Sequence, residues 1–400
     1  MTKMLYLCYF GLREPLVQAQ VLPYLREMSK VENLKICLLT FEPNFKEKWT
    51  AAQIETEKQK LSNENINWYC LGYHKQPSAL ATAFDVMNGV QFILNLSRKE
   101  KFDFFHARTH IPVLMALIAS KYTKSRIIFD IRGLMAEEYA DGGVWQENSK
   151  PFRLIKYVER KGIEKAAQIV VLTNRFRDYL VERNLKNSEN IEVIPCCVDL
   201  SRIEQANKTE KSGCFELIYA GSVTGLYLLR EMGEFFLELK KHKPDSFFRV
   251  LTSSDPHFVQ ETLKDLQIDR NDYEVAKVLP EEVPKYLKKA HLGISFRKPT
   301  FSQIASSPTK IPEYLACGLP VVSNYGIGDT DYLLESEGVG VCLKDFGVSE
   351  ISDAVKRILE LLNENEIAEK CVKVARKYFD LQEVGGRRYR RLYGELLKKE

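Results

Sequence analysis

Short apolar runs alternate with helix-type patterns along almost the whole chain. Such alternation is typical of parallel β-sheets covered by helices, because each parallel strand needs a crossover connection to the next. Before residue 200, the predicted strands cover residues 5–10, 34–41, 66–71, 102–106, 126–131, 168–173 and 191–194. A second series covers residues 215–221, 247–252, 273–276, 292–296, 319–323 and 340–343. The pattern therefore predicts an α/β protein with two doubly wound sheets, which bind ligands at the carboxyl ends of their strands.

The predicted helices lie between these strands, at residues 16–29, 78–98, 111–120, 150–166 and 174–183, then 228–240, 255–266, 283–290, 348–363 and 367–379. A chain of 400 residues is too long for one hydrophobic core. Residues 200–213 are polar and show no period, which indicates a linker. The predicted organisation is a domain over 1–199, a linker over 200–213, a domain over 214–380 and a Tyr-, Leu- and Arg-rich helix over 381–400.

Composition argues against several classes of protein. The net charge of +4 arises from 58 basic and 54 acidic residues, and no zinc-finger spacing occurs, so nucleic-acid binding is not expected. The nine cysteines include no Cys-x-x-Cys pair, which argues against a zinc or dithiol site and favours the cytoplasm. The N-terminus runs directly into a strand, and no apolar run approaches the ~20 residues needed to span a bilayer. We therefore expect neither a signal peptide nor a membrane span.

Residues 306–324 carry the most specific chemical signal. They predict a short helix, opened by serines and prolines and closed by glycine, and then a buried strand. A helix start presents unpaired N–H groups, and Lys310 adds its charge there, so the segment predicts a phosphate site. Glu313, one turn later, is placed to accept from vicinal hydroxyls, whereas Pro312 predicts a loose helix start. The alternative is an ordinary helix with Lys310 and Glu313 as an exposed pair.

The order Pro-Thr-Lys-x-x-Glu-Tyr-Leu-Ala-Cys-Gly-x-Pro-Val-Val in this segment resembles the nucleotide-binding segment of family-4 retaining glycosyltransferases of the GT-B fold. The resemblance implies two Rossmann-like domains facing a central cleft, the first for the acceptor and the second for the nucleotide sugar. It also implies that the C-terminal helix packs back on the first domain. The chain departs from the family at Ala305, where a glutamate usually contacts the donor sugar. The donor-binding residues predicted in this segment are Ser306, Ser307, Thr309, Lys310 and Glu313.

Other predicted strand ends match the donor site of the family in part. The loop with Gly221 and Ser222 faces the donor diphosphate in the family, but Ser222 replaces the usual arginine and no lysine follows. Arg297 and Lys298 are predicted to supply the missing charge, and a solvated loop is the alternative. Gly11 suits close approach of a sugar or phosphate, although a plain strand-to-helix turn would also need it. Its loop lacks the Gly-x-Gly-x-x-Gly pattern of dinucleotide binding.

Polar residues at two strand ends of the first half predict the reacting centre. By resemblance, His106 matches a family histidine, and Asp130 lies where relatives carry an active-site histidine or aspartate. Both are predicted to be catalytic together with Lys310. The residues predicted to bind the acceptor are Arg108, Arg132 and Glu138. The alternatives are a structural histidine, a strand-capping ion pair between Asp130 and Arg132, and a solvated Glu138.

The implied reaction is hexosyl-type transfer from a nucleotide diphosphate to a hydroxyl of a glycan or lipid-linked acceptor, with retention and without metal or other cofactor. UDP and a role in cell-surface polysaccharide or lipopolysaccharide assembly are family-level expectations. Basic residues in 150–165 and 387–391 predict peripheral contact with the cytoplasmic membrane face, and solvated faces are the alternative. Two rival functions stay open, a sugar-nucleotide epimerase of the same fold and a non-catalytic sugar-nucleotide-binding subunit.

Overall fold

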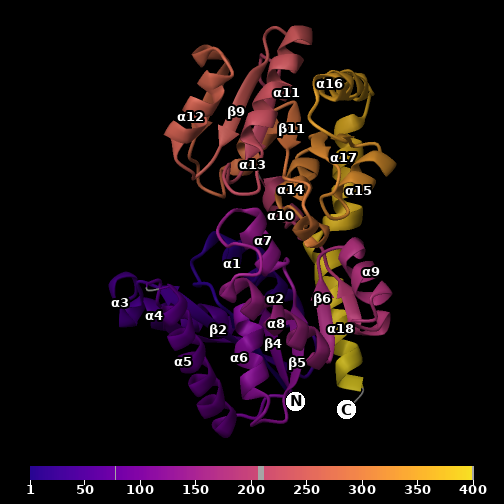
Figure 1. The fold of residues 1–400 in the computed structure, drawn as a ribbon. Coiled ribbons are helices and arrows are strands. Elements are labelled where there is room, and N and C mark those ends of the chain that lie inside the picture. The colour runs from indigo at the N-terminus through magenta and orange to yellow at the C-terminus, as the bar shows by residue number, and fades with distance from the viewer. Residues whose placement is uncertain (77, 206–210, 399–400) are drawn as a thin grey trace. The chain divides into compact units, whose positions relative to one another are not determined.

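The chain folds into two compact units (Figure 1), and the computed structural model describes residues 1–76, 78–205 and 211–398. The first unit comprises Met1–Glu137, Trp145–Pro195 and Gly385–Glu400, and the second comprises Glu138–Val144 and Cys196–Val384. Of the predicted linker, residues 206–210 lie outside the described residues, and the residues before them form helix α10 (Leu200–Gln205).

The first unit is built on a seven-stranded parallel sheet with the order β3-β2-β1-β4-β5-β6-β7. The winding direction therefore reverses between β1 and β4, which is where doubly wound sheets bind ligands. Apolar residues dominate these strands because both faces of the sheet are covered. The strands are β1 (Thr2–Cys8), β2 (Leu34–Pro43), β3 (Ile66–Tyr73), β4 (Phe104–Arg108), β5 (Arg126–Asp130), β6 (Gln168–Val171) and β7 (Ile191–Val193).

Helices cover both faces of this sheet. On one face α5, α6 and α8 pack side by side, and Gly89 of α5 and Gly162 of α8 lie directly against the rings of Phe41 and Phe129. On the other face α2 packs against α18 (Figure 1). The helices are α1 (Pro15–Gln20), α2 (Leu22–Met28), α3 (Phe45–Lys48), α4 (Ala51–Asn63), α5 (Ser78–Lys99), α6 (His110–Ala119), α7 (Met135–Asp141), α8 (Lys150–Lys165), α9 (Asn174–Glu182) and α18 (Arg387–Lys398), with α7 divided between the units and a 3-10 turn at Ser188–Asn190.

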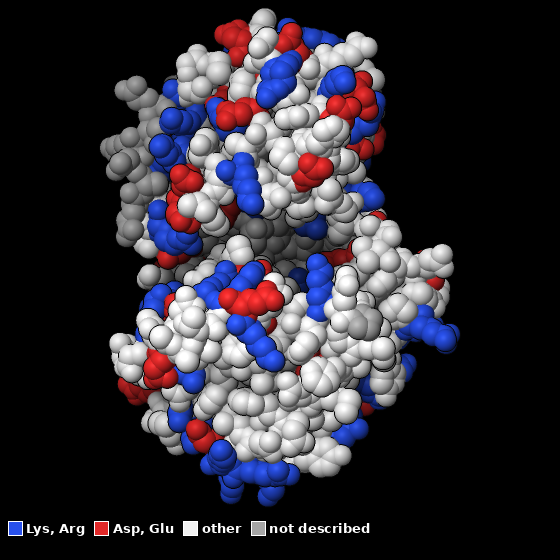
Figure 2. Space-filling view, turned by 90° about the vertical axis from the view of Figure 1, so that its left-hand side faces the viewer, with Lys and Arg blue, Asp and Glu red and all other residues white. Residues whose placement is uncertain are grey.

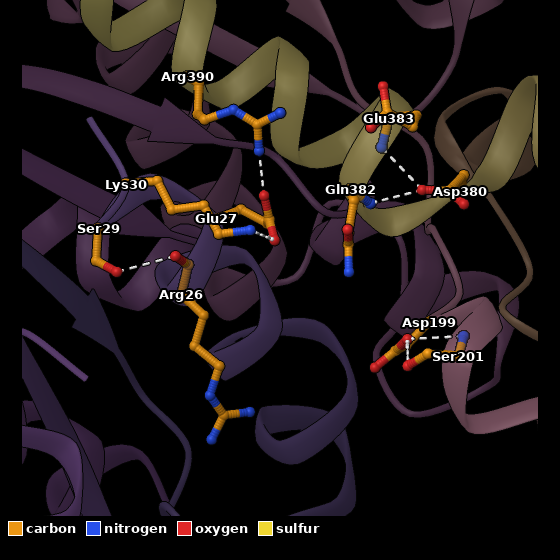
Figure 3. Close-up of polar contacts among 10 residues, drawn as sticks. All are labelled: Arg26, Glu27, Ser29, Lys30, Asp199, Ser201, Asp380, Gln382, Glu383 and Arg390. Atoms are coloured by element: carbon orange, nitrogen blue, oxygen red, sulfur yellow. Dashed lines mark hydrogen bonds and ion pairs between the residues drawn. The ribbon is translucent and has the colours of Figure 1, made fainter. Parts of the chain in front are cut away.

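The C-terminal helix α18 is anchored on α2 by charge and by aromatic packing. Arg390 donates to the carboxylate of Glu27, which also accepts from Lys30 at 2.6 Å (Figure 3). Tyr389 lies against Tyr24 of α2, with 5.2 Å between ring centroids, and is 1% exposed. The last helix of the chain is therefore part of the packed core of the first unit.

The second unit repeats the plan with a six-stranded parallel sheet in the order β10-β9-β8-β11-β12-β13. Its strands are β8 (Glu216–Ala220), β9 (Phe247–Leu251), β10 (Tyr273–Ala276), β11 (Leu292–Ser295), β12 (Val321–Asn324) and β13 (Gly340–Leu343). One apolar cluster packs under α11 (Leu229–His242), α12 (Pro256–Asp265) and α16 (Val348–Leu362). A second packs under α13 (Val283–Lys289), α14 (Lys310–Ala316), α15 (Thr330–Ser336) and α17 (Ile367–Phe379). The winding direction reverses beside β8, so the loop after β8 lies at the switch point of this sheet.

Each predicted strand is present, with ends that differ by a few residues, but the helices differ more. The helix predicted over 16–29 is interrupted at Val21, whose φ of −124° and ψ of −64° are not helical. α14 begins at Lys310 rather than at the serines, which places Pro312 in the first turn, where a missing N–H removes no helical hydrogen bond. The prediction of a loose helix start at Pro312 was therefore wrong. No helix was predicted at α3, α4, α7, α10 and α15, and α10 lies in the segment that was expected to be a linker.

The cysteine thiols and the surface charges do not indicate a particular function. All nine cysteines are free. In the described part of the chain one helix, α5, is long and apolar enough to cross a membrane by length and composition, and 39% of its apolar window is buried in this fold. On the face drawn in Figure 2, acidic and basic side chains are interspersed over much of each unit.

Candidate functional site

Lys310 is the first residue of α14 and is only 5% exposed. Its Nζ lies 3.0 Å from the hydroxyl of Tyr219, and 4.3 and 4.0 Å from the ring centroids of Tyr219 and Tyr227. Gly221, directly after β8, allows this approach, because its φ is +140° and a Cβ there would lie 3.0 Å from Nζ. The ammonium group is therefore held between two aromatic rings at the carboxyl end of β8.

A second buried cation, Arg297, follows β11 and is 9% exposed. The side-chain amide of Asn324 binds both the N–H and the C=O of Arg297, at 2.9 Å each. The Nη1 of Arg297 donates to Ser306 Oγ at 2.9 Å, and the guanidinium lies 5.0 Å from the ring centroid of Tyr227. Its Nε has no hydrogen-bond partner within the described residues. Arg297 and Lys310 thus share the ring of Tyr227 and belong to one site.

These two cations lack a counter-charge at contact distance. In the described part of the chain, no carboxylate forms an ion pair with Lys310 or Arg297. Burial lowers the pKa of Lys310 well below its usual value, Arg297 lowers it further, and Glu313 offsets this in part. Burying unpaired positive charge is unfavourable, since hydration is lost and no partner is gained. Convergent, unpaired N–H donors of this kind are suited to an anion.

Glu313 lies one turn after Lys310 on α14 and is half-buried. Burial raises the pKa of its carboxyl to about 7, although Lys310 and Arg202 favour the ionised form. Among the residues that the structure describes, none donates a hydrogen bond to this carboxyl. An acceptor group therefore stands beside the cation pair, as recognition of a diol requires.

The remaining predicted donor residues have other surroundings. Ser307 Oγ accepts from the backbone N–H of Cys196 at 3.1 Å, so this hydroxyl is already engaged. Thr309 and Ser222 are exposed, and the C=O of Ser222 accepts from the hydroxyl of Tyr219. Lys298 is half-buried beside Arg297. Of the predicted donor set, the structure therefore brings Gly221, Arg297, Ser306, Lys310 and Glu313 together.

The sequence analysis did not single out two further features of the second unit. Gln303, in the 3-10 turn Phe301–Ala305, is fully buried, and its Oε1 has no hydrogen-bond partner within the described residues. Asp329 and Asp331 have Asp-x-Asp spacing, but Asp331 is 1% exposed and accepts from the N–H groups of Gly326 and Tyr332. No group of three His, Cys, Asp or Glu in the described ranges could hold a metal ion.

The residues predicted at the reacting centre meet in the first unit, but they are buried. Asp130 ends β5 and is 0% exposed. Its Oδ2 accepts from Arg108 Nη1 at 3.4 Å, and its Oδ1 lies 3.5 Å from Arg132 Nη1. His106 Nε2 is 3.8 Å from Asp130 Oδ2. Burial alone would raise the pKa of Asp130, but Arg132, His106 and Arg108 together hold it well below its usual value, so the carboxylate is ionised.

Helix α18 covers this network. The hydroxyl of Tyr389 donates to Asp130 Oδ2 at 3.2 Å, and that of Tyr393 lies 2.7 Å from His106 Nδ1. Burial lowers the pKa of His106, which favours the neutral imidazole. This geometry favours the ion-pair alternative for Asp130 and the structural alternative for His106. Their catalytic role stays a prediction.

The other predicted positions of the first unit have local explanations. A Cβ on Gly11 would lie 2.9 Å from Glu42 Oε2, and this buried carboxylate accepts from the N–H of Leu12 at 2.8 Å. Gly11 therefore lets the loop after β1 pack on Glu42, and the plain-turn alternative accounts for it. Glu138 lies in α7, in the segment grouped with the second unit. Thr109, after β4, has a φ of +73°, a strained conformation for a β-branched residue at a strand end.

A polar cluster that the sequence did not reveal lies at the carboxyl edge of the first sheet. It consists of Tyr9, His74 and Asp85, which come from three separate segments of the chain. No local motif links them, because they are joined only through the packing of α5 beside β1 and β3.

Comparison with known proteins places this geometry in context. Residues 71–202 match the family model described as Glycosyltransferase Family 4. No curated protein matches the chain. Among solved structures, the sucrose-phosphate synthase of Thermosynechococcus elongatus superposes with a TM-score of 0.71 at 12% identity, over 100% of both chains.

Two further structures carry nucleotide sugars. Anabaena HepE (Alr3699), in complex with UDP-glucose, superposes with a TM-score of 0.65 at 14% identity, over 100% of both chains. The UDP-GlcNAc 2-epimerase of Neisseria meningitidis, bound to UDP-GlcNAc, superposes with a TM-score of 0.60 at 15% identity, over 99% of this chain and 100% of that one. At these identities the similarity establishes the fold alone. The chain therefore has the GT-B fold, and its residues 71–202 match Glycosyltransferase Family 4.

Proposed function

We propose that the protein is a glycosyltransferase that moves a sugar from a nucleotide diphosphate to a hydroxyl of a glycan or lipid-linked acceptor, with retention of anomeric configuration. The observation that carries this proposal is the pair of buried cations, Lys310 and Arg297, which lack a counter-charge among the described residues. A diphosphate supplies two anionic groups and many acceptor oxygens, so it would satisfy both cations at once.

Each residue of the site has a role in this proposal. Lys310 and Arg297 bind the diphosphate, and Ser306 orients the guanidinium through the 2.9 Å hydrogen bond. Glu313 accepts from the ribose hydroxyls, and the absence of a side chain at Gly221 leaves room for the phosphates beside Lys310. The UDP-bound state of Anabaena HepE supports uracil as the base to test first.

The proposed reaction is front-face displacement. The bond between the anomeric carbon and the diphosphate oxygen breaks, and its electron pair leaves with the diphosphate. The acceptor oxygen bonds to the anomeric carbon on the same face, and its proton passes to a diphosphate oxygen. Lys310 and Arg297 stabilise the negative charge that develops on the leaving group, which is electrostatic catalysis without a metal ion. Turnover that survives a chelator is the expected result.

Two alternatives have specific support. The similarity to the epimerase structure supports a sugar-nucleotide epimerase, which would turn over its substrate without any acceptor. Ala305 and the lack of an Arg–Lys pair after Gly221 support a non-catalytic binding subunit, which would bind UDP and turn over nothing. Incubating candidate UDP-sugars alone and with acceptors, followed by mass analysis, separates the three functions.

The binding test is a calorimetric titration with UDP, GDP, dTDP, CDP and ADP of wild type, Lys310→Met and Lys264→Met. Methionine keeps most of the lysine volume but lacks the charge, and Lys264, on α12 of the same unit, is a lysine outside the site with a 74% exposed side chain. One nucleotide that binds wild type and Lys264→Met and loses affinity for Lys310→Met would support the proposal. Binding of none, or equal binding to all three proteins, would refute it.

The setting of the reaction belongs to the same proposal. Nine free cysteines support a reducing, cytoplasmic compartment. Assembly of cell-surface polysaccharide or lipopolysaccharide and peripheral contact with the inner membrane through α8 and α18 are expectations from the resemblance. Flotation with anionic vesicles at low and high salt tests the contact, and failure to float at low salt would exclude it.

A further inference from the structure

Asp85 lies in the third turn of α5 and is completely buried. Its carboxylate accepts three hydrogen bonds. Oδ2 accepts from the hydroxyl of Tyr9 at 2.7 Å and from the backbone N–H of His74 at 2.9 Å, and Oδ1 lies 2.6 Å from His74 Nδ1. Three donors compensate the burial of this charge. The cluster therefore holds the imidazole of His74 in a fixed orientation.

The cluster lies where ligands bind in this class of fold. Tyr9 directly follows β1 and His74 directly follows β3, so both stand at the carboxyl edge of the first sheet. The buried network around Asp130 faces α18 instead. Within the cluster of Tyr9, His74 and Asp85, the group most exposed to solvent is His74, whose side chain is 50% exposed.

The contact with Asp85 sets the tautomer of His74. A carboxylate only accepts hydrogen bonds, so the proton of the neutral imidazole lies on Nδ1 and the lone pair on Nε2. This Nε2 makes no hydrogen bond within the described residues. The structure thus holds an oriented acceptor at the sheet edge. The backbone N–H of His74 already ties the loop to Asp85, so loop closure alone does not require an imidazole at this position.

The exposed ring of Phe84 lies beside His74, and we call this pair of side chains the corner. The ring of Phe84 stands at 88° to the imidazole, with 5.1 Å between centroids, and Phe84 is 56% exposed. Leu80 and Met87, on the same side of α5, are 72% and 73% exposed. The corner therefore offers an apolar face and one hydrogen-bond acceptor to an uncharged ligand.

We infer that His74, oriented by Asp85, and Phe84 form the subsite that binds an uncharged sugar of the acceptor. A sugar hydroxyl donates to Nε2 while an apolar C–H face of the sugar ring packs on Phe84. Asp85 and Tyr9 act as positioning residues. This inference rests on the proposed function, because it assigns the acceptor of that reaction.

The test is a nitrogen-15 NMR titration of the full chain, labelled at its six histidines, with methyl α- and β-glycosides of glucose, galactose and mannose, with and without UDP. The His74 signal is assigned by its loss in His74→Asn. The expected result is a saturable shift of Nε2 with at least one glycoside, and Phe84→Ala weakens this binding by about twofold to tenfold. No shift of Nε2 with any glycoside, or equal binding to Phe84→Ala, would overturn the inference.

Matched variants separate binding from a structural role. His242→Asn removes another exposed imidazole, on α11, and Tyr122→Ala removes another exposed ring, so neither changes the titration. In transfer assays His74→Asn raises KM for the acceptor and leaves KM for the donor unchanged. A purely structural His74 would instead lower Tm and leave the acceptor KM unchanged. UDP titrated into the same samples reports separately on the Lys310 site, so loss of the acceptor inference and loss of the proposed function give different results.

Discussion

Replacing Lys310 by methionine is expected to change ligand affinity and stability in opposite directions. In the free protein the ammonium is buried between Tyr219 and Tyr227 and has no carboxylate partner among the described residues. The lowered pKa of Lys310 has burial as its main cause, so the charge is unfavourable until an anion binds. Methionine removes this charge and keeps the packing. The hydroxyl of Tyr219 keeps its bond to the C=O of Ser222, so no donor is orphaned.

The magnitude follows from the lost charge-assisted contact. Hydrogen bonds to charged groups contribute about 1.5–3 kcal/mol, so UDP should bind about tenfold to 150-fold more weakly to Lys310→Met. Thermal unfolding without nucleotide should occur at a higher temperature than in wild type, because an unpaired buried charge is gone. UDP should then raise the Tm of wild type far more than that of the variant.

The assay is thermal unfolding with and without UDP, supported by calorimetric affinities, on wild type, Lys310→Met and Lys264→Met. Lys264→Met should match wild type in both measurements, because its side chain is exposed and outside the site. A lower Tm for Lys310→Met without nucleotide, combined with unchanged UDP affinity, would mean that Lys310 is a structural residue. The anion-site reasoning would then be refuted.

Three further predictions concern single groups. The pKa of Lys310 is lowered in the free protein, and a bound diphosphate raises it. The affinity for UDP should therefore be constant below the lowered pKa and should fall as pH rises through that pKa. Calorimetry in buffers of different ionisation enthalpy would detect the uptake of a proton on binding, and absence of this uptake would contradict the assignment. Wild type should prefer UDP to 2′-deoxy-UDP by about tenfold, and Glu313→Gln should lose most of this preference; equal preference in both proteins would exclude Glu313 from the ribose site. Asp130→Asn leaves Arg108 and Arg132 buried without their carboxylate, so urea unfolding should show a loss of about 3–5 kcal/mol, and a neutral effect would contradict the network. Since the pKa of Asp130 is lowered in the fold, its stabilisation is present above the unfolded value of about 3.9 and is lost as pH falls through the folded value.

The strands could be predicted because parallel strands buried on both faces leave apolar runs that need no knowledge of their neighbours. Helix α4 was missed for the opposite reason. Only Leu61 is buried in its 13 residues, so no apolar stripe marks it. A local signal was nevertheless present, since Thr50 and Gln53 form a capping box at its start. The break at Val21 also had a local signal, because Pro23 lies inside the predicted helix, lacks the N–H that a helix interior needs, and stands in the first turn of α2.

The candidate site likewise combines features that the sequence indicated with features that only the folded structure reveals. Lys310, Glu313 and Gly221 stand in segments whose residue order was informative, whereas the bond from Arg297 to Ser306 and the shared ring of Tyr227 depend on folding. The network around Asp130 shows more clearly what the sequence could not predict. Position at a strand end favoured catalysis, yet α18, more than 250 positions later in the sequence, supplies the tyrosine that covers the carboxylate.

The sequence by itself determined the alternation of strands and helices, the division into two sheets, and a lysine and an acid one helical turn apart. These properties are local, because periodicity and spacing act over a few residues. Only the tertiary structure decided which charges are buried, which are paired, and that Tyr9, His74 and Asp85 meet. The reason is physical: hydration, pKa and hydrogen-bond partners depend on the atoms within a few ångströms, and in a doubly wound sheet those atoms come from distant parts of the chain.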